Sequence, residues 1–231
     1  LAECRTDSQA YFGRVAGAWD AVRSEMFTGE YADVFAGPPE WQALPTPEGA
    51  TFFVVEKDAE GYIRGKGEEK HGIRASNTSP LTFTDVFVPV ENIIGGLTGQ
   101  GLKQASKVFG YTRLMVASMA LGGGEAALDI VIPYAKERIQ FKTPLSEKQG
   151  YTHKLVVPNA VRLEAAAAYT EEQATRLDAG EKDLQVEGSI AKLFASETAM
   201  FCAHAAVQIH GGMGYSKELP IERYFRDAKI T

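Results

Sequence analysis

Two places in the second half of the chain combine residue types that suit a phosphorylated ligand. Arg138 stands near the expected end of a long helical segment, and Gly211 and Gly212 follow the end of another. A guanidinium group offers a planar fork of donors that matches paired phosphate oxygens, whereas the same charge at a helix C-terminus can serve only to compensate the helix dipole. Adjacent glycines let backbone amides come close to a ligand, and they also commonly stop a helix. Both interpretations stay open for both places.

Other common catalytic arrangements are missing from the sequence. The chain has four histidines, which are His71, His153, His204 and His210. None has partners at metal-ligand spacing, and the last two fall on different faces of a helix, so no metal site is expected. There is no nucleophile elbow and no phosphate-binding P-loop. Glu125 and Glu137 lie on a long helical segment, where we expect solvated or paired charges.

The composition is that of an ordinary globular chain. Of the 231 residues, 45% are hydrophobic and 23% are charged, which is enough to bury a sizeable core. The net charge of −6 and the pI near 5.4 give no electrostatic support for binding nucleic acid or an anionic membrane. The sparing use of cysteine, at Cys4 and Cys202, indicates a reducing compartment. No run approaches the ~18 apolar residues of a membrane span, and the start at Leu1 is expected not to be the biological one.

The first half of the chain is expected to form strands and turns. Thr51–Glu56 and Leu81–Val90 are rich in β-branched and aromatic residues, and turn-forming residues surround them. Residues 36–50 contain several prolines and predict a loop, and residues 1–25 receive no assignment. The pattern predicts a partial antiparallel β-barrel in a domain over residues 1–97.

The second half has the pattern of a helical bundle. After a glycine-rich hinge at residues 95–101, helices are expected at about 102–138, 146–179, 184–209 and from 219 onward, with Pro133 and the glycines 122–124 as the breaks in the first. Ser146 is the expected N-cap of the second helix and Gly180 its stop. Short loops between long helices predict an antiparallel four-helix bundle over residues 98–231. The fold class expected is therefore α+β with more than one domain.

Five segments resemble the acyl-CoA dehydrogenase family and occur in the family's order. They are His71–Ser76 with Phe83–Gly95, Tyr111–Arg113, Tyr134–Phe141 with Pro144, Leu145 and Gln149, Gln208–Tyr215, and Pro220–Ile230. A single short motif of this kind arises by chance, whereas five in order are specific. The chain is identified as similar to the C-terminal portion of the family, in the short- and medium-chain-like branch.

The resemblance implies an FAD site and a substrate site. In the family the arginine matched by Arg138 binds the FAD pyrophosphate, and the segment matched by Gln208–Gly212 reaches across a subunit boundary to a neighbouring FAD. The implied FAD-binding residues are Arg138, Gln140, Phe141, Gln149, Gln208, Ile209, His210, Gly211 and Gly212. The implied substrate-binding residues are Gly110, Tyr111, Thr112 and Arg113. Gln149 could equally be a solvated first-turn residue and Arg113 a structural ion-pair partner, and His210 is expected to pack or hydrogen-bond.

The chain departs from the family pattern at several positions. Many members have an aspartate where this chain has Gly110, and a glycine where it has Lys142. Some relatives have their catalytic glutamate at the position of Thr112, and threonine does not abstract a proton. In the other branch the resemblance implies that the glutamate base lies about four residues past Thr231. Residues 26–35 faintly resemble part of the family's β domain, but the family's tryptophan-bearing flavin segment cannot be read in them.

The function implied is α,β-dehydrogenation of an acyl-CoA thioester, with hydride transfer to N5 of FAD. Electron-transferring flavoprotein is the expected electron acceptor, and the expected assembly is a homo-oligomer, a dimer or a tetramer. The compartment would be the bacterial cytoplasm or the mitochondrial matrix. Two alternatives stay open: a non-catalytic subunit that completes a partner's FAD site, and a flavin monooxygenase on the same fold.

Overall fold

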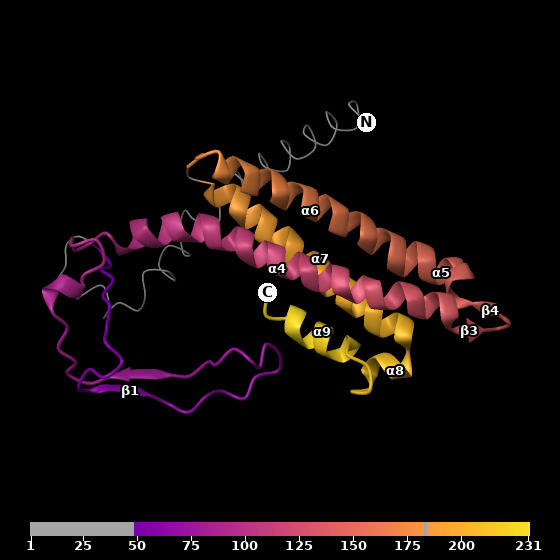
Figure 1. The fold of residues 1–231 in the computed structure, drawn as a ribbon, viewed down its shortest axis with the longest axis horizontal. Coiled ribbons are helices and arrows are strands. Elements are labelled where there is room, and N and C mark those ends of the chain that lie inside the picture. The colour runs from indigo at the N-terminus through magenta and orange to yellow at the C-terminus, as the bar shows by residue number, and fades with distance from the viewer. Residues whose placement is uncertain (1–48, 183) are drawn as a thin grey trace, which may run out of the picture. The chain divides into compact units, whose positions relative to one another are not determined.

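The computed structural model describes residues 49–182 and 184–231. The predictions made for residues 1–48, including most of the loop at 36–50 and the faint resemblance at 26–35, lie outside the described residues. Figure 1 shows the elements in order, and in the described part helices account for most of the regular structure.

The strand region contains one short hairpin. Strand β1, Tyr62–Arg64, pairs antiparallel with β2, Leu81–Phe83, in the register Tyr62↔Phe83 and Arg64↔Leu81. The rings of Tyr62 and Phe83 stack with their centroids 5.2 Å apart. The described residues form two-stranded sheets and no closed barrel, so the partial barrel remains a prediction.

Both predicted strands need correction. Residues 51–56 form only a single bridge, between Phe53 and Ile93, and Phe52, Phe53 and Val54 are 41–51% exposed. A β-type pattern becomes a strand only where a partner supplies the ladder, and none of the described residues does so here. The second strand ends at Phe83 and not at Val90, because the chain turns at Asp85, whose φ is 49°.

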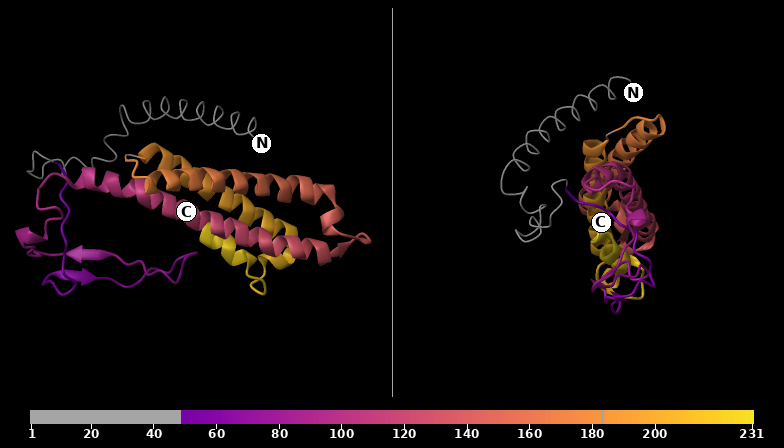
Figure 2. Two further views of the ribbon diagram at one scale, coloured as in Figure 1. Left: turned by 45° about the horizontal axis from the view of Figure 1, so that its top comes forward. Right: turned by 90° about the vertical axis from the view of Figure 1, so that its left-hand side faces the viewer.

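The helical region follows the predicted pattern closely. Helix α4, Gly101–Glu137, runs parallel to α7, Gln185–His210, and α6, Val157–Asp178, packs beside both in the opposite direction. The short helices α8, Gly212–Tyr215, and α9, Ile221–Ala228, follow α7. Figure 2 shows these helices side by side from two further directions. The four-helix arrangement of α4, α6, α7 and α9 is thus confirmed within the described residues.

Two features of the predicted helices were wrong. The first helix continues without a break through the glycines 122–124 and Pro133, because its buried face packs along α7. The second does not start at Ser146. The chain first forms a 3-10 turn, Leu145–Glu147, then α5, Gln149–Tyr151, and a π-helical stretch, Thr152–Val156, before α6 begins. The predicted stop is confirmed, because Gly180 follows α6 with φ +84°.

Small side chains make up most of the contact between α4 and α7. One buried cluster consists of Leu114, Ala117, Ala120, Ala191, Ala195 and Ala199. A second, toward the other end of the bundle, consists of Ala127, Val131, Ala135, Leu145, Ala206, Ile209 and Ile221. Alanine-rich faces let two helix axes approach closely, so the first cluster holds the N-terminal halves of α4 and α7 together and the second holds their C-terminal ends together.

The expectation that no segment is long and apolar enough to span a membrane is wrong for α4. By length and composition Gly101–Glu137 could cross a membrane, although the core helix of a globular bundle meets the same criterion. Ten residues of α4 are buried, and six of them, between Leu114 and Ala135, belong to the two clusters shared with neighbouring helices. The packing therefore identifies α4 as the core helix of this bundle.

Candidate functional site

The C-terminal end of α4 leads into a small hairpin. Strand β3, Ile139–Gln140, pairs with β4, Thr143–Pro144, and the two turn residues Phe141 and Lys142 have φ values of 51° and 68°. Arg138 caps α4: its N–H donates to the carbonyl of Tyr134 at 2.9 Å. Its own carbonyl accepts from the N–H of Leu145, also at 2.9 Å. The backbone of Arg138 is therefore fixed at both sides while its side chain is exposed.

The C-terminal end of α7 combines a buried ring with an open backbone. His210 is 4% exposed, and its Nδ1 donates to the carbonyl of Ala206 at 2.8 Å. Gly211 ends the helix at φ +60° and ψ −135°. A Cβ placed on Gly211 or on Gly212 would meet no atom within 4 Å. The glycine pair therefore both stops the helix and leaves its backbone accessible, so the two interpretations of this segment hold together.

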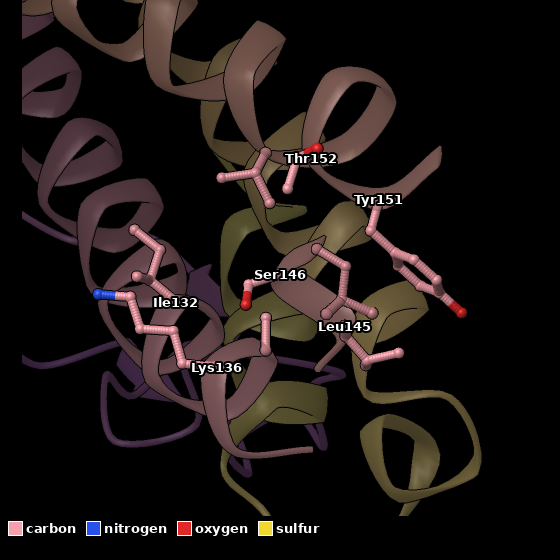
Figure 3. A pocket seen from close by; sticks show the side chains of 9 residues that line it. Ile132, Lys136, Leu145, Ser146, Tyr151 and Thr152 are labelled. Atoms are coloured by element: carbon pink, nitrogen blue, oxygen red, sulfur yellow. The ribbon is translucent and has the colours of Figure 1, made fainter. Parts of the chain in front are cut away.

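These two helix ends lie at the same end of the bundle, beside β3, β4, α5 and α8 (Figure 1). Between them is an apolar pocket of about 110 Å³, shown in Figure 3. It is lined by Ile132, Ala135, Lys136, Leu145, Ser146, Tyr151, Thr152, Val156 and Ile209. Ile132 and Lys136 come from α4, Leu145 and Ser146 from the 3-10 turn, and Tyr151 and Thr152 from α5 and the π-helical stretch. The predicted FAD-binding residues are thus brought to one region by segments about 70 positions apart in the chain.

The residues at this end suit the chemistry of a dinucleotide. In the described residues the Arg138 guanidinium makes no hydrogen bond or ion pair, so its fork of donors is available to paired phosphate oxygens. Gln149 and Gln208 are exposed and offer neutral donors and acceptors, as does Gln140 in β3. Phe141 is 86% exposed at the tip of the hairpin. A cation, several amides and an exposed ring fit a flavin dinucleotide, whereas Ile209 and His210 face the interior and support this surface from behind.

The predicted substrate-binding residues lie elsewhere on α4. Gly110 is buried against α7, Tyr111 is 52% exposed, and Thr112 and Arg113 are half-buried. A rise of 1.5 Å per residue puts Arg113 roughly 37 Å from Arg138 along the helix. One copy of the described chain therefore does not bring the substrate-binding and cofactor-binding sets together.

Beside this segment lies a cleft of about 320 Å³. Its lining is more polar than that of the other pocket and consists of Lys107, Gly110, Tyr111, Leu177, Glu181, Lys182, Leu184 and Gln185. Nη1 of Arg113 donates to Oε1 of Gln185 at 3.0 Å, and its guanidinium lies 5.5 Å from the ring centroid of Phe109. Gln185 was missed by the sequence analysis, because nothing in its local pattern signals a contact with a residue 72 positions earlier.

Two further hydrogen bonds involve α9 and residues that line neither of these pockets. Arg226 Nη1 donates to the carbonyl of His71 at 2.6 Å, and Asp227 Oδ1 accepts from the N–H of Ile73 at 2.7 Å. They tie the segment after β1 to α9, so two of the family-like segments meet.

No group of three or more potential metal ligands occurs among residues 49–182 and 184–231.

Comparisons with known proteins show the family to which the chain belongs. The family model of the acyl-CoA dehydrogenase C-terminal domain matches residues 99–231. The mitochondrial short-chain specific acyl-CoA dehydrogenase of Sus scrofa is 43% identical over 184 residues, a match that covers 80% of this chain and 44% of that protein. The acryloyl-CoA reductase (NADH) of Anaerotignum propionicum is 41% identical, with 80% and 46% covered. The structure of butyryl-CoA dehydrogenase from Megasphaera elsdenii is 42% identical at a TM-score of 0.74, with 79% and 47% covered. The chain thus spans less than half the length of these relatives, and it belongs to the acyl-CoA dehydrogenase family.

Proposed function

We propose that the protein to which this chain belongs is an FAD-dependent acyl-CoA dehydrogenase that removes hydrogen from the α and β carbons of an acyl-CoA thioester. The observation that carries the proposal is the convergence of Arg138 and the open Gly211–Gly212 backbone on one end of the bundle. Family membership and the 43% identity to a short-chain specific acyl-CoA dehydrogenase support it.

In this proposal the bundle end binds and orients the cofactor. Arg138 holds the pyrophosphate with its guanidinium fork, and Gly211 and Gly212 let the cofactor approach the backbone of α7. Gln149 and Gln208 contribute hydrogen bonds at the rim. FAD, when bound, supplies N5 as the hydride acceptor for the β carbon. The chain's own residues supply position, charge and exclusion of water.

The segment from Gly110 to Arg113 has the substrate role in the proposal. Arg113 provides a fixed positive charge beside the ring of Phe109, which suits the carbonyl or phosphate groups of an acyl-CoA. Thr112 has no group that takes a proton from carbon, so the proposal assigns the general base to a glutamate beyond Thr231. A carboxylate acts as such a base when burial and positioning raise its basicity.

The separation of the two residue sets leads to a proposal about assembly. Since Arg113 and Arg138 lie roughly 37 Å apart on one helix, a complete site needs residues from another copy or from other parts of the protein. We place the cofactor-binding end of one copy against the substrate-binding part of a second, in a homo-oligomer. Electron-transferring flavoprotein is the proposed electron acceptor.

Retention of flavin by an Arg138 variant tests the cofactor site. Full-length Arg138→Ala protein should lose most of its FAD on desalting, because one guanidinium pairing with phosphate contributes about 1.5–3 kcal/mol. Arg138→Lys should retain an intermediate amount, since the ammonium keeps the charge without the fork. Arg162→Ala serves as the control, because Arg162 on α6 has another exposed guanidinium, which lies over the ring of Phe201 in α7. Full flavin in the alanine variant would refute the pyrophosphate role.

A second candidate function is a non-catalytic subunit that completes an FAD site for a partner. The glycine at position 110, where many relatives carry a carboxylate, favours it. Mixing the full-length holoprotein with a panel of acyl-CoA thioesters distinguishes the two, because a dehydrogenase bleaches its flavin absorbance anaerobically. Adding enoyl-CoA to photoreduced protein tests the reverse direction, which the name of the acryloyl-CoA reductase relative suggests. An absence of any bleaching or reoxidation would favour the non-catalytic role.

A further inference from the structure

The side chain of Gln185 lies over Gly110 and makes a hydrogen bond at each end of its amide. Its Oε1 accepts from Nη1 of Arg113 at 3.0 Å, and its Nε2 donates to the carbonyl of Ser106. A Cβ placed on Gly110 would stand 3.1 Å from that Nε2. The amide therefore occupies space that exists because residue 110 has no side chain.

This arrangement holds the guanidinium of Arg113 without neutralising it. Gln185 is a neutral acceptor, and Phe109 contributes the negative face of its ring at 5.5 Å. Within the described part of the chain Arg113 forms no ion pair with a carboxylate. Among the described residues no carboxylate offsets the charge of Arg113, and four of its five N–H donors make no hydrogen bond there. A guanidinium fixed in this way loses little side-chain entropy when an anionic or carbonyl group binds it.

The contact between α4 and α7 at this point does not depend on Gln185. A Cβ on Gly188 would stand only 2.7 Å from the carbonyl oxygen of Gly110, so the two helices already touch through their backbones. Leu184 is 4% exposed and anchors the start of α7. The amide of Gln185 is thus an addition to a helix contact that the glycine pair and Leu184 establish.

We propose that Gln185 is a positioning residue, which orients Arg113 toward the acyl-CoA substrate. It acts through Arg113 and does not touch the substrate. The inference rests on the proposed function, in which the segment from Gly110 to Arg113 binds acyl-CoA. Under this proposal the start of α7 contributes to substrate binding, and the C-terminal end of α7 contributes to cofactor binding.

The test uses steady-state kinetics of the full-length holoenzyme with its preferred acyl-CoA. Gln185→Met fills nearly the same space without an acceptor, and it should raise KM roughly fivefold or more while kcat changes by less than about twofold. Arg113→Ala should raise KM by roughly ten- to a hundredfold. Since Gln185 acts through Arg113, the double variant should be no worse than Arg113→Ala alone. Thermal unfolding of each variant checks that the fold is intact.

The outcomes separate the two proposals. An increase of KM in Arg113→Ala with an unchanged KM in Gln185→Met would overturn the positioning role and leave the proposed function standing. Additive effects in the double variant would do the same, because they would make Gln185 independent of Arg113. An unchanged KM in Arg113→Ala would overturn the substrate role of the segment and the positioning role with it.

Discussion

The ring of Tyr134 stacks on the imidazole of His210, with 4.1 Å between the ring centroids and 26° between the planes. Tyr134 lies one helical turn before Arg138, and its carbonyl accepts the N–H of Arg138. His210 directly precedes Gly211 at the end of α7. Because a carbonyl oxygen can only accept, the hydrogen bond to Ala206 puts a proton on Nδ1 of His210. The stacked pair therefore links the two helix ends that carry the proposed cofactor contacts.

Replacing His210 should loosen this end of the bundle. His210→Ala removes the stack and a buried hydrogen bond, so the free energy of unfolding should fall by about 2–3 kcal/mol in urea titrations. His210→Phe retains the stack and should lose less. His153→Ala changes an exposed histidine and should shift stability by less than about 0.5 kcal/mol. Equal stability of His210→Ala and the control would mean that the stack does not hold the helix ends.

The two glycines after His210 should respond differently to substitution. Gly211 has φ +60°, so Gly211→Ala should cost about 1–2 kcal/mol of stability even though its Cβ would meet open space. Gly212 starts α8 without a positive φ, and Gly212→Ala should leave stability nearly unchanged.

Flavin retention then separates folding from binding at this site. If the cofactor approaches the backbone, Gly212→Ala should weaken FAD retention although its unfolding curve matches the unmodified protein. Full retention of FAD by this variant would place the cofactor away from Gly212. The measurement is the flavin-to-protein absorbance ratio after desalting, in full-length protein.

The parts of the fold that depend on local chemistry could be predicted from the sequence. A glycine at the end of an apolar helical pattern stops a helix wherever the tertiary structure places it, so the ends of α6 and α7 at Gly180 and Gly211 agree with the prediction. Arg138 was expected near the end of a long helical segment, and it is the C-cap residue of α4.

Features that depend on distant partners could not be predicted. Residues 51–56 have the composition of a strand, but a strand needs a partner, and the described residues provide a single bridge. Ser146 is a residue type that commonly caps a helix N-terminus. Leu145, however, packs in the buried cluster at the end of α4, and the chain forms a 3-10 turn at Leu145–Glu147 where the helix start was predicted. The contact between Gln185 and Arg113 joins two helices far apart in the sequence, and neither local pattern records it.

The glycines in the middle of α4 provide a matched test of helix packing. Gly122 has open space where a Cβ would lie, so Gly122→Ala should raise the free energy of unfolding by up to about 1 kcal/mol through helix propensity. A Cβ on Gly124 would stand 3.1 Å from Leu163 and 3.3 Å from Cα of Ala199. Gly124→Ala should therefore destabilise the bundle, by roughly 1–3 kcal/mol. In urea unfolding the free energy of unfolding should therefore rise in Gly122→Ala and fall in Gly124→Ala. Changes of the same sign in both variants would contradict the close packing of α4, α6 and α7.

Burial of Cys202 predicts a loss of stability at alkaline pH. The side chain is fully buried, and burial raises the pKa of the thiol from 9.0 to about 11, against a smaller opposing effect of the charge on Arg162. The folded state therefore binds the thiol proton more tightly than the unfolded state does. The resulting stabilisation is complete below pH 9 and is lost as the pH rises through about 11.

Comparison with Cys202→Ala isolates this contribution. The alanine variant lacks the titrating group and leaves a small cavity, so it should be less stable by about 1 kcal/mol at neutral pH. Between pH 9 and 11 the free energy of unfolding should fall less in the alanine variant than in the unmodified protein. The difference between the two losses should approach 2–3 kcal/mol, roughly 1.4 kcal/mol for each unit of pKa difference. Burial also raises the pKa of Tyr169 to about 12, but Tyr169 is present in both proteins and cancels in the comparison. Parallel stability curves across this pH range would show that the Cys202 thiolate is accommodated in the folded bundle, contrary to the burial seen between α4, α6 and α7.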